Sequence, residues 1–272
     1  MRLRSRILNL ALLLAVSASA VAQEKPESSD KGTSVAEPKE YVDKLEMRSS
    51  AKNEVVERIE KPLHTYGDAV RGNVNGTVWA WGKSGRPKAF LELFRATEPN
   101  SPWINAITLT GQETVSVKTG FGDGWKPSRT QIEPQMIPDA SAPDSKENVR
   151  LLQMKEQSRR FTAHEFWDPN NSRFELRLLP RPLLRYKDEA AGIQDGTAYI
   201  LAHDTNPEIV LLVEALGATV EKSQWHFSAA RLGSAELHLE IDGSGVWKQE
   251  RTPGVAGKPI DPYWLFFVTP AK

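Results

Sequence analysis

The feature that most constrains this chain is a pattern of residues that occurs twice, 120 residues apart. The residues shared by the two copies are Pro62 and Pro182, Leu63 and Leu183, Tyr66 and Tyr186, Asp68 and Asp188, Gly72 and Gly192, Gly76 and Gly196, and Thr77 and Thr197. After a shift of two residues, the correspondence resumes between residues 103–130 and 225–252, so that 15 of 60 aligned positions are identical. Chance would give about four. The sequence therefore predicts an internal duplication.

The first 22 residues have the pattern of a secretory signal peptide. Arg2, Arg4 and Arg6 precede an apolar run over residues 7–16, and small residues at 18–22 offer a cleavage site. The run is too short to span a bilayer, and no later segment is apolar enough to do so. We therefore expect a secreted or periplasmic protein, exported by a cleavable leader, with no transmembrane segment after cleavage.

Charge and cysteine content exclude several classes of function. Without the three arginines of the leader, the chain has 32 basic and 35 acidic residues, which argues against a nucleic-acid partner. The chain has no cysteine, so an exported form must be stabilised by burial rather than by disulfides. A structural zinc site is also disfavoured, and we expect no cofactor.

Four segments are expected along the chain. Residues 1–22 form the signal peptide and residues 23–45 a disordered linker, because this linker has few large apolar residues to bury. Residues 46–135 form the first β repeat with an N-terminal helix at 50–60. Residues 136–272 form a helix from Asp144 to about Arg159, the second β repeat and a C-terminal strand.

The remaining pattern is that of short strands separated by turns. Apolar β-type runs recur at intervals of 8–12 residues, which is typical of antiparallel meanders. Asn75-Gly76 and Asp195-Gly196 are interpreted as hairpin turns, and residues 168–172 as another turn. The predicted fold class is α+β, mainly β: two duplicated antiparallel meanders, each preceded by a helix, packed as one curved sheet or open barrel-like domain.

The repeated residues have structural interpretations. Asp68 and Asp188 are expected to accept hydrogen bonds from backbone N–H groups in turns, although paired carboxylates at a shared cleft are an alternative. Tyr66 and Tyr186 are expected to pack as anchors over these turns. Gly76 and Gly196 are expected to permit the turn geometry.

Aromatic residues give one candidate ligand site. Trp79 and Trp81 share a face of one predicted strand, and Arg86 lies on the adjoining loop. In an exported protein, exposed tryptophans would suit stacking on sugar rings, whereas buried ones would be core residues.

Histidines give one candidate metal site. If residues 225–241 form a hairpin around Leu232-Gly233-Ser234, then His226, His238 and Glu240 share the face opposite the core. That set could hold a metal or act as a base with its orienting acid. The alternative is a solvated polar face. The sequence contains no nucleophile elbow, phosphate loop or dinucleotide fingerprint.

Two passages resemble a group of exported hypothetical proteins of planctomycete-type bacteria. They are residues 175–186 with Asp195-Gly-Thr and residues 206–214, and Gly76-Thr-Val-Trp-Ala-Trp-Gly82 with Gly85-Arg-Pro87. The resemblance spans most of residues 60–250 and implies export, but no activity or catalytic residues.

The leading functional expectation is a non-enzymatic binding or structural protein of the cell envelope, with an unknown envelope ligand or protein as partner. It depends on the duplication, the eight tryptophans and the missing catalytic signature. A metal-dependent hydrolase using His226, His238 and Glu240 is one alternative. A carrier of lipids or other apolar ligands is another.

Overall fold

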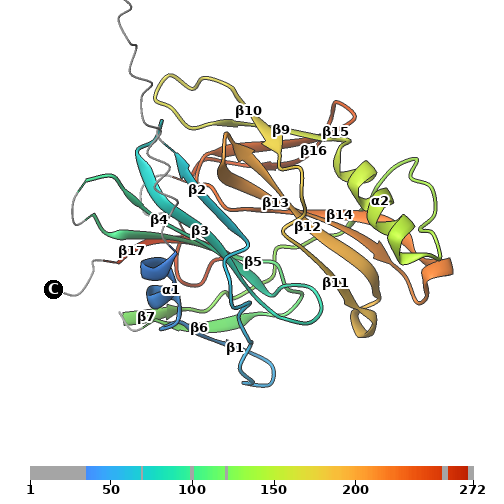
Figure 1. Ribbon diagram of the computed structural model, residues 1–272, viewed down its shortest axis with the longest axis horizontal. Helices are drawn as coiled ribbons and strands as arrows, with labels where there is room; N and C mark the ends of the chain where they lie inside the picture. Colours follow the sequence, from blue (N-terminus) through green and yellow to red (C-terminus); the bar gives the residue numbers. More distant parts are fainter. Residues whose placement is uncertain (1–34, 69, 99–100, 120–121, 253–256, 269–272) are drawn as a thin grey trace, which may run out of the picture. The chain divides into compact units, whose positions relative to one another are not determined.

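Two antiparallel meanders with the same strand pairing form the centre of the structure (Figure 1). The computed structural model describes residues 35–68, 70–98, 101–119, 122–252 and 257–268. All of them belong to one compact unit, Thr33–Lys272. The predicted signal peptide and most of the predicted linker lie outside the described residues.

The first half contains one short helix and two sheets. In chain order its elements are α1 (Ala36–Val42), β1 (Glu46–Ser49), β2 (His64–Asp68), β3 (Asn73–Trp81), β4 (Ala89–Ala96), β5 (Trp103–Leu109), β6 (Val115–Thr119), β7 (Gly122–Trp125) and β8 (Gln135–Met136). β2, β3, β4 and β5 follow one another in a five-stranded sheet, and β1, β6 and β7 form a small separate sheet.

The second half repeats this pairing with one added strand. Its elements are α2 (Glu147–Ser158), β9 (Phe161–Phe166), β10 (Phe174–Leu178), β11 (Leu184–Asp188), η1 (Glu189–Ala191), β12 (Ile193–His203), β13 (Asn206–Leu216), η2 (Val220–Lys222), β14 (Gln224–Arg231), β15 (Glu236–Ile241), β16 (Ser244–Gln249) and β17 (Tyr263–Val268). β11 to β14 pair as β2 to β5 do, and β9, β15 and β16 pair as β1, β6 and β7 do. β10 joins the two groups into one nine-stranded sheet.

The last strand of each half pairs within the other half. β8 follows the first half but pairs with β14, and β17 follows the second half but pairs with β5. Each sheet is therefore completed by a strand from the other half, so the halves are joined by backbone hydrogen bonds as well as by side chains.

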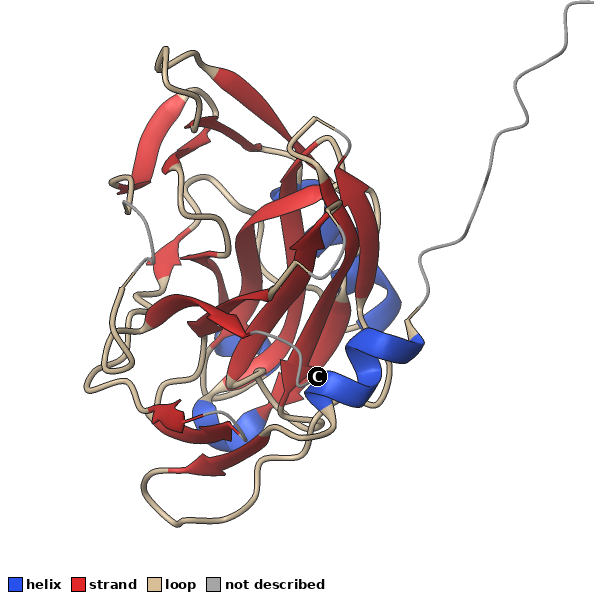
Figure 2. Cartoon of the chain, turned by 90° about the vertical axis from the view of Figure 1, so that its left-hand side faces the viewer, coloured by secondary structure: helices blue, strands red, loops and turns tan. Residues whose placement is uncertain are grey.

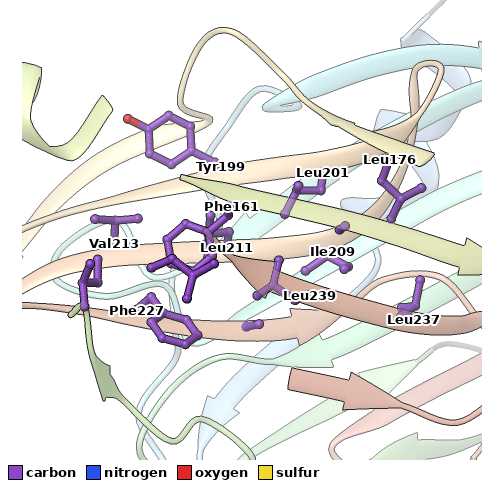
Figure 3. Packing of buried hydrophobic residues seen from close by; sticks show 14 of the residues in the cluster. Phe161, Leu176, Tyr199, Leu201, Ile209, Leu211, Val213, Phe227, Leu237 and Leu239 are labelled. Carbon is purple, nitrogen blue, oxygen red and sulfur yellow. The ribbon is translucent and has the colours of Figure 1, made fainter. Parts of the chain in front are cut away.

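The described residues form three large hydrophobic cores, and a small fourth cluster lies between β5 and β17. The curled sheet encloses one core, in which Phe161, Leu211, Phe227 and Leu239 come together (Figure 3) and Met154 of α2 packs. The opposite face of β12–β14 packs against β3 and β4, and this second core lies between the halves. The third core lies between the five-stranded sheet, α1 and the small sheet. Figure 2 shows the strands stacked in layers, with helices at their margins.

The predicted fold class is confirmed: the protein is mainly β, antiparallel, and includes one sheet curled into a half-barrel. The helix at α2 and the turn at residues 168–172 are also confirmed; Asp168 accepts hydrogen bonds from the backbone and the hydroxyl of Ser172. The helix predicted at residues 50–60 is wrong. This segment is extended and bridges β1 and β3, while the helix of the first half is α1.

Part of the predicted linker is ordered for a simple reason. Tyr41, Val42 and Leu45 are buried in the third core. Three apolar side chains in a polar stretch are enough to anchor it when a sheet face is available, a contact that composition alone does not reveal.

The repeated Tyr and Gly residues form a packing unit rather than a hairpin turn. Gly76 lies within β3 opposite Tyr66, and a Cβ atom built on Gly76 would lie 2.3 Å from the Tyr66 ring. Gly196 and Tyr186 repeat this arrangement, with a closest distance of 2.7 Å. The hairpins predicted at residues 75–76 and 195–196 are therefore wrong: these glycines leave room for a ring that crosses the strand.

This packing predicts the effect of adding one methyl group. Gly76→Ala should lower the free energy of unfolding by about 1–3 kcal/mol, because the Tyr66 ring must move. Gly67→Ala is the matched control, since its Cβ would meet nothing closer than an atom 3.9 Å away. Urea unfolding of both variants checks the prediction, and equal stability of the two would contradict it.

Candidate functional site

The structure places the predicted ligand-binding tryptophans in the core. Trp79 and Trp81 are 0% and 1% exposed and pack between the five-stranded sheet and α1. The Trp79 indole N–H donates to the Thr77 hydroxyl at 2.9 Å, and the Arg58 guanidinium lies over its ring. Neither ring offers a face to a ligand, so the buried alternative holds and the prediction of an exposed stacking surface is wrong.

The predicted metal residues are not brought together. The proposed hairpin does not form: β14 pairs with β13 and β8, whereas β15 pairs with β16 and β9. His226 is therefore opposite Glu214 rather than Glu240, and its ring nitrogen contacts the Gln224 carbonyl. His238 instead stacks on His164. Within the described ranges, no group of three or more His, Asp or Glu could hold a metal ion.

The repeated aspartates form turns, as expected. Asp68 accepts hydrogen bonds from the backbone N–H groups of Val70 and Arg71, both at 3.0 Å. Asp188 accepts one from Ala191 at 3.2 Å. Each turn lies where its half meets a loop of the other half, and the two junctions differ in their chemistry.

One junction, here called the Arg86 junction, is a closed ion pair. Arg86 extends from the β3–β4 loop and donates to both carboxylate oxygens of Glu214, at 2.7 and 2.5 Å. The Tyr186 hydroxyl donates to the same carboxylate at 2.7 Å. Arg86 and Glu214 are 3% and 0% exposed. The predicted ligand residue Arg86 therefore fixes the two halves together and is not accessible to a ligand.

The other junction, here called the Arg71 junction, contains more acids than bases. Arg71 donates to Glu208 at 2.5 Å and to Glu165, and lies 3.7 Å from Asp68. His203 lies beside them, with Nδ1 2.7 Å from Glu165. Glu165 and Glu208 are 0% and 1% exposed and lie close enough to share one proton.

A fourth buried carboxyl group completes this junction. Glu92, on β4, is 3% exposed and accepts a hydrogen bond from the Tyr66 hydroxyl. The Asn206 amide N–H donates to Glu208 at 3.1 Å, which leaves its Oδ1 atom turned away from that carboxyl. Neither Asn206 Oδ1 nor Glu208 Oε2 has a hydrogen-bond partner in the part of the chain that the structure describes.

Burial controls the ionisation of this cluster. Desolvation and the neighbouring Glu165 raise the pKa of Glu208 to about 8, against the opposing effect of Arg71. Desolvation also raises the pKa values of Glu92 and Glu165. For His203, desolvation and the Arg71 charge lower the pKa, which favours the neutral ring. At neutral pH the cluster therefore retains protons on buried carboxyl groups.

A cavity of about 670 Å³ opens beside the Arg71 junction. Its polar lining includes Arg71, Asn73, Glu92, Asn206, Glu208 and Arg251, and its apolar lining includes Phe94, Trp167, Leu232 and Leu265. Both halves contribute, through β4 and β17 on one side and β13 and the segment after β14 on the other. The volume is that of a site for a small molecule.

No family model, curated protein or solved structure matches the chain. The candidate site therefore depends on the geometry alone. No helix among the described residues has the length and apolar character needed to cross a membrane.

The residues of this cavity were missed in the sequence because they come from strands and turns that lie far apart in the chain. One signal was present: at positions related by 120 residues, Arg86 and Lys88 of the first half become Asn206 and Glu208 of the second. A loss of two positive charges at otherwise matched positions marks a difference in role between the two loops.

Proposed function

We propose that this chain is a non-enzymatic binding protein of the cell envelope that holds a small molecule in the cavity at the Arg71 junction. The observation that carries the proposal is a cavity lined by Asn206 and Glu208, whose buried Oδ1 and Oε2 atoms lack hydrogen-bond partners among the described residues. Buried polar groups are normally hydrogen-bonded, and a ligand would supply what the protein does not.

The two alternatives fit less well. A hydrolase built on His226, His238 and Glu240 would need these residues together, and β14 and β15 are separated by four strands in the sheet order. A lipid carrier would place an acyl chain against the carboxyl groups of Glu92 and Glu208. Burying polar groups against hydrocarbon without new hydrogen bonds costs free energy. Export to the envelope remains a proposal based on the leader sequence.

Blocking the cavity should abolish binding. Ser234 lines the cavity, so Ser234→Phe should occupy part of its volume, whereas Ser244→Phe places the same side chain at the exposed start of β16 as a control. A thermal-shift screen of small cations, amino acids, sugars and fatty acids against the purified protein gives the ligand class. A ligand at a hundredfold excess over Kd stabilises by about 2.7 kcal/mol.

The expected result is a shift in the native protein and in Ser244→Phe that Ser234→Phe loses. Thr252→Phe serves as a second blocking variant if Ser234→Phe does not fold, because Thr252 also lines the cavity and its backbone N–H donates to the Ser234 carbonyl at 3.0 Å. A shift that survives both blocking variants would place the ligand elsewhere and overturn the proposal. So would the absence of a shift with every class.

A further inference from the structure

We infer that the cavity at the Arg71 junction takes an organic cation, whose ammonium or guanidinium group lies between Glu92, Glu208 and Asn206. This inference rests on the proposed binding function and specifies the class of ligand. It is carried by the count of charges at the junction, by the atoms left open there and by the comparison with the Arg86 junction.

The count of charges leaves room for a cation. Asp68, Glu165 and Glu208 share the single guanidinium of Arg71, and Glu92 is bound by a neutral hydroxyl. Two further arginines donate to backbone carbonyls rather than to these carboxyl groups. Arg231, near the cluster, donates to Gly233, Ala235 and Glu250, and Arg251, in the cavity lining, donates to Phe166 and Asp168. Buried carboxylates are stable when paired with a positive charge and costly when they are not.

The open atoms of Asn206 and Glu208 are both acceptors once Glu208 is ionised, so they suit a ligand that donates. The Arg71 Nε donor, which also lacks a hydrogen-bond partner among the described residues, lies 3.7 Å from the Asp68 carboxylate. The Asn206 amide is oriented by its own N–H, which donates to Glu208, and the Oδ1 atom is therefore free to accept. Glu208 Oε2 is a second acceptor. An ammonium group has three donors and a guanidinium five, and neither has an acceptor. A carboxylate or phosphate ligand would place its own acceptor oxygens against these acceptors, and no hydrogen bond could form.

The Arg86 junction shows how the same fold neutralises such a carboxylate. There the β3–β4 loop brings Arg86 to Glu214 of the other half. At the Arg71 junction the corresponding connection between β12 and β13 lacks that arginine, and the matching position is Asn206, the first residue of β13. The protein thus provides the cation at one junction and leaves a cavity at the other.

The cavity favours an organic cation over a metal ion. No metal-binding group of three or more side chains occurs in the described part of the chain, and Arg71 already binds one oxygen of Glu165 and one of Glu208. Phe94, Leu232 and Leu265 line the cavity, where they can pack on the hydrocarbon portion of a ligand.

Binding should release a proton. Glu208 holds a proton near neutral pH because of burial and Glu165, and an ammonium group favours the ionised carboxylate. The proton leaves to solvent as the cation binds, so affinity should rise between pH 6 and pH 8. This separates a cation from a neutral ligand of the same shape.

Calorimetric titration with 2-phenylethylammonium, butylguanidinium and the neutral 2-phenylethanol tests the inference. We expect both cations to bind the native protein at least tenfold more tightly than the alcohol, with proton release detected as a heat that depends on the buffer. Glu208→Gln and Glu92→Gln should each weaken cation binding at least tenfold. Glu240→Gln, whose carboxyl lies beside His164 outside this cavity, is the control and should bind as the native protein does.

The outcomes separate this inference from the proposed function. Equal binding of cation and alcohol, lost in Ser234→Phe, would overturn the choice of a cation but keep a ligand-binding cavity. Preference for carboxylates or phosphates would do the same. Cation binding unchanged in both Gln variants would overturn the inference by placing the cation elsewhere. No binding by any probe class would overturn both.

Discussion

Replacing Arg86 by Leu should lower the free energy of unfolding by about 3–5 kcal/mol, the largest effect that we expect from a single substitution in this chain. The substitution leaves Glu214 as a buried carboxylate with the Tyr186 hydroxyl as its remaining donor. Both the ion pair and the surrounding strands lie where the two halves meet, so the loss should affect the whole cooperative unit. Urea unfolding followed by circular dichroism measures it.

A double variant tests whether the lost charge partner is the cause. Arg86→Leu combined with Glu214→Leu removes both charges, and buried pairs replaced by apolar residues are often nearly neutral in stability. We expect the double variant to be more stable than Arg86→Leu alone. If the double variant loses as much free energy of unfolding as Arg86→Leu and Glu214→Leu lose together, packing rather than the unpaired charge is the main cause.

An exposed ion pair provides the control. Arg173 and Glu175 lie 2.6 Å apart, but their side chains are 50% and 65% exposed. Arg173→Leu should therefore change stability far less than Arg86→Leu does, because water screens exposed pairs. The contrast between Arg86 and Arg173 isolates burial, since the two pairs have similar distances.

The sequence predicted the strands well where a local pattern determines them. The alternating and apolar runs that became β12 and β13 are long, flanked by turn residues and rich in β-branched side chains. The order of the strands in the sheets was harder to predict. β14 and β15 are consecutive in the chain and joined by a short turn, yet they do not pair with each other. β14 pairs with β13 (residues 206–216), and β15 pairs with β9 (residues 161–166). Such pairing is decided by the layers on each face, which local spacing does not encode.

The glycines show how a correct observation led to a wrong interpretation. The recurrence of Gly76 and Gly196 was real, and Asn-Gly and Asp-Gly are strong turn signals. The fold requires glycine at these positions for a different reason: a side chain there would collide with the rings of Tyr66 and Tyr186. The recurrent Tyr in the same pattern was the available clue, because a ring and a glycine at matched spacing can occupy the same space.

The candidate site was predicted least well, for a reason of principle. Glu92, Glu165 and Glu208 are ordinary acidic residues in sequence, and their burial and proximity follow from the stacking of the sheets. The predicted sites relied on rarer residues, tryptophan and histidine, which serve here mainly in packing. Differences between two otherwise matched halves were more informative than rare residues.

The Arg71 junction should also make the protein less stable as the pH rises. The groups around Glu208 are Glu165, Arg71 and His203, with Arg231 more distant. In the folded protein the pKa of Glu208 is about 8, whereas an unfolded glutamate titrates near 4.3. Between these values the folded state binds a proton that the unfolded state has released. The stabilisation from this Glu208 proton is complete below the pKa of the unfolded state, and it is lost as the pH rises through the pKa of the folded state.

Glu208→Gln should remove the part of this dependence that comes from Glu208, while Glu92 and Glu165, whose pKa values are also raised, still contribute. The free energy of unfolding of the native protein should fall by up to about 1.4 kcal/mol per pH unit between pH 5 and pH 8 from this group, then level off. The amide cannot ionise and still accepts from Arg71, so the variant should match the native protein at pH 5 and exceed its stability at pH 9. Urea unfolding at several pH values measures both curves.

The control, Glu113→Gln, should change stability in the acidic range instead. Glu113 pairs with Lys88, and that hydrogen bond lowers the pKa of Glu113, so Glu113→Gln should affect stability below pH 5 and leave the slope between pH 6 and pH 8 as in the native protein. A native curve that is flat over this interval, or a Glu208→Gln curve parallel to it, would show that Glu208 is ionised in the folded state. A gain of stability at pH 9 on losing Glu208 would instead identify a residue kept at a cost to folding, as is common where a binding site must hold charge away from water.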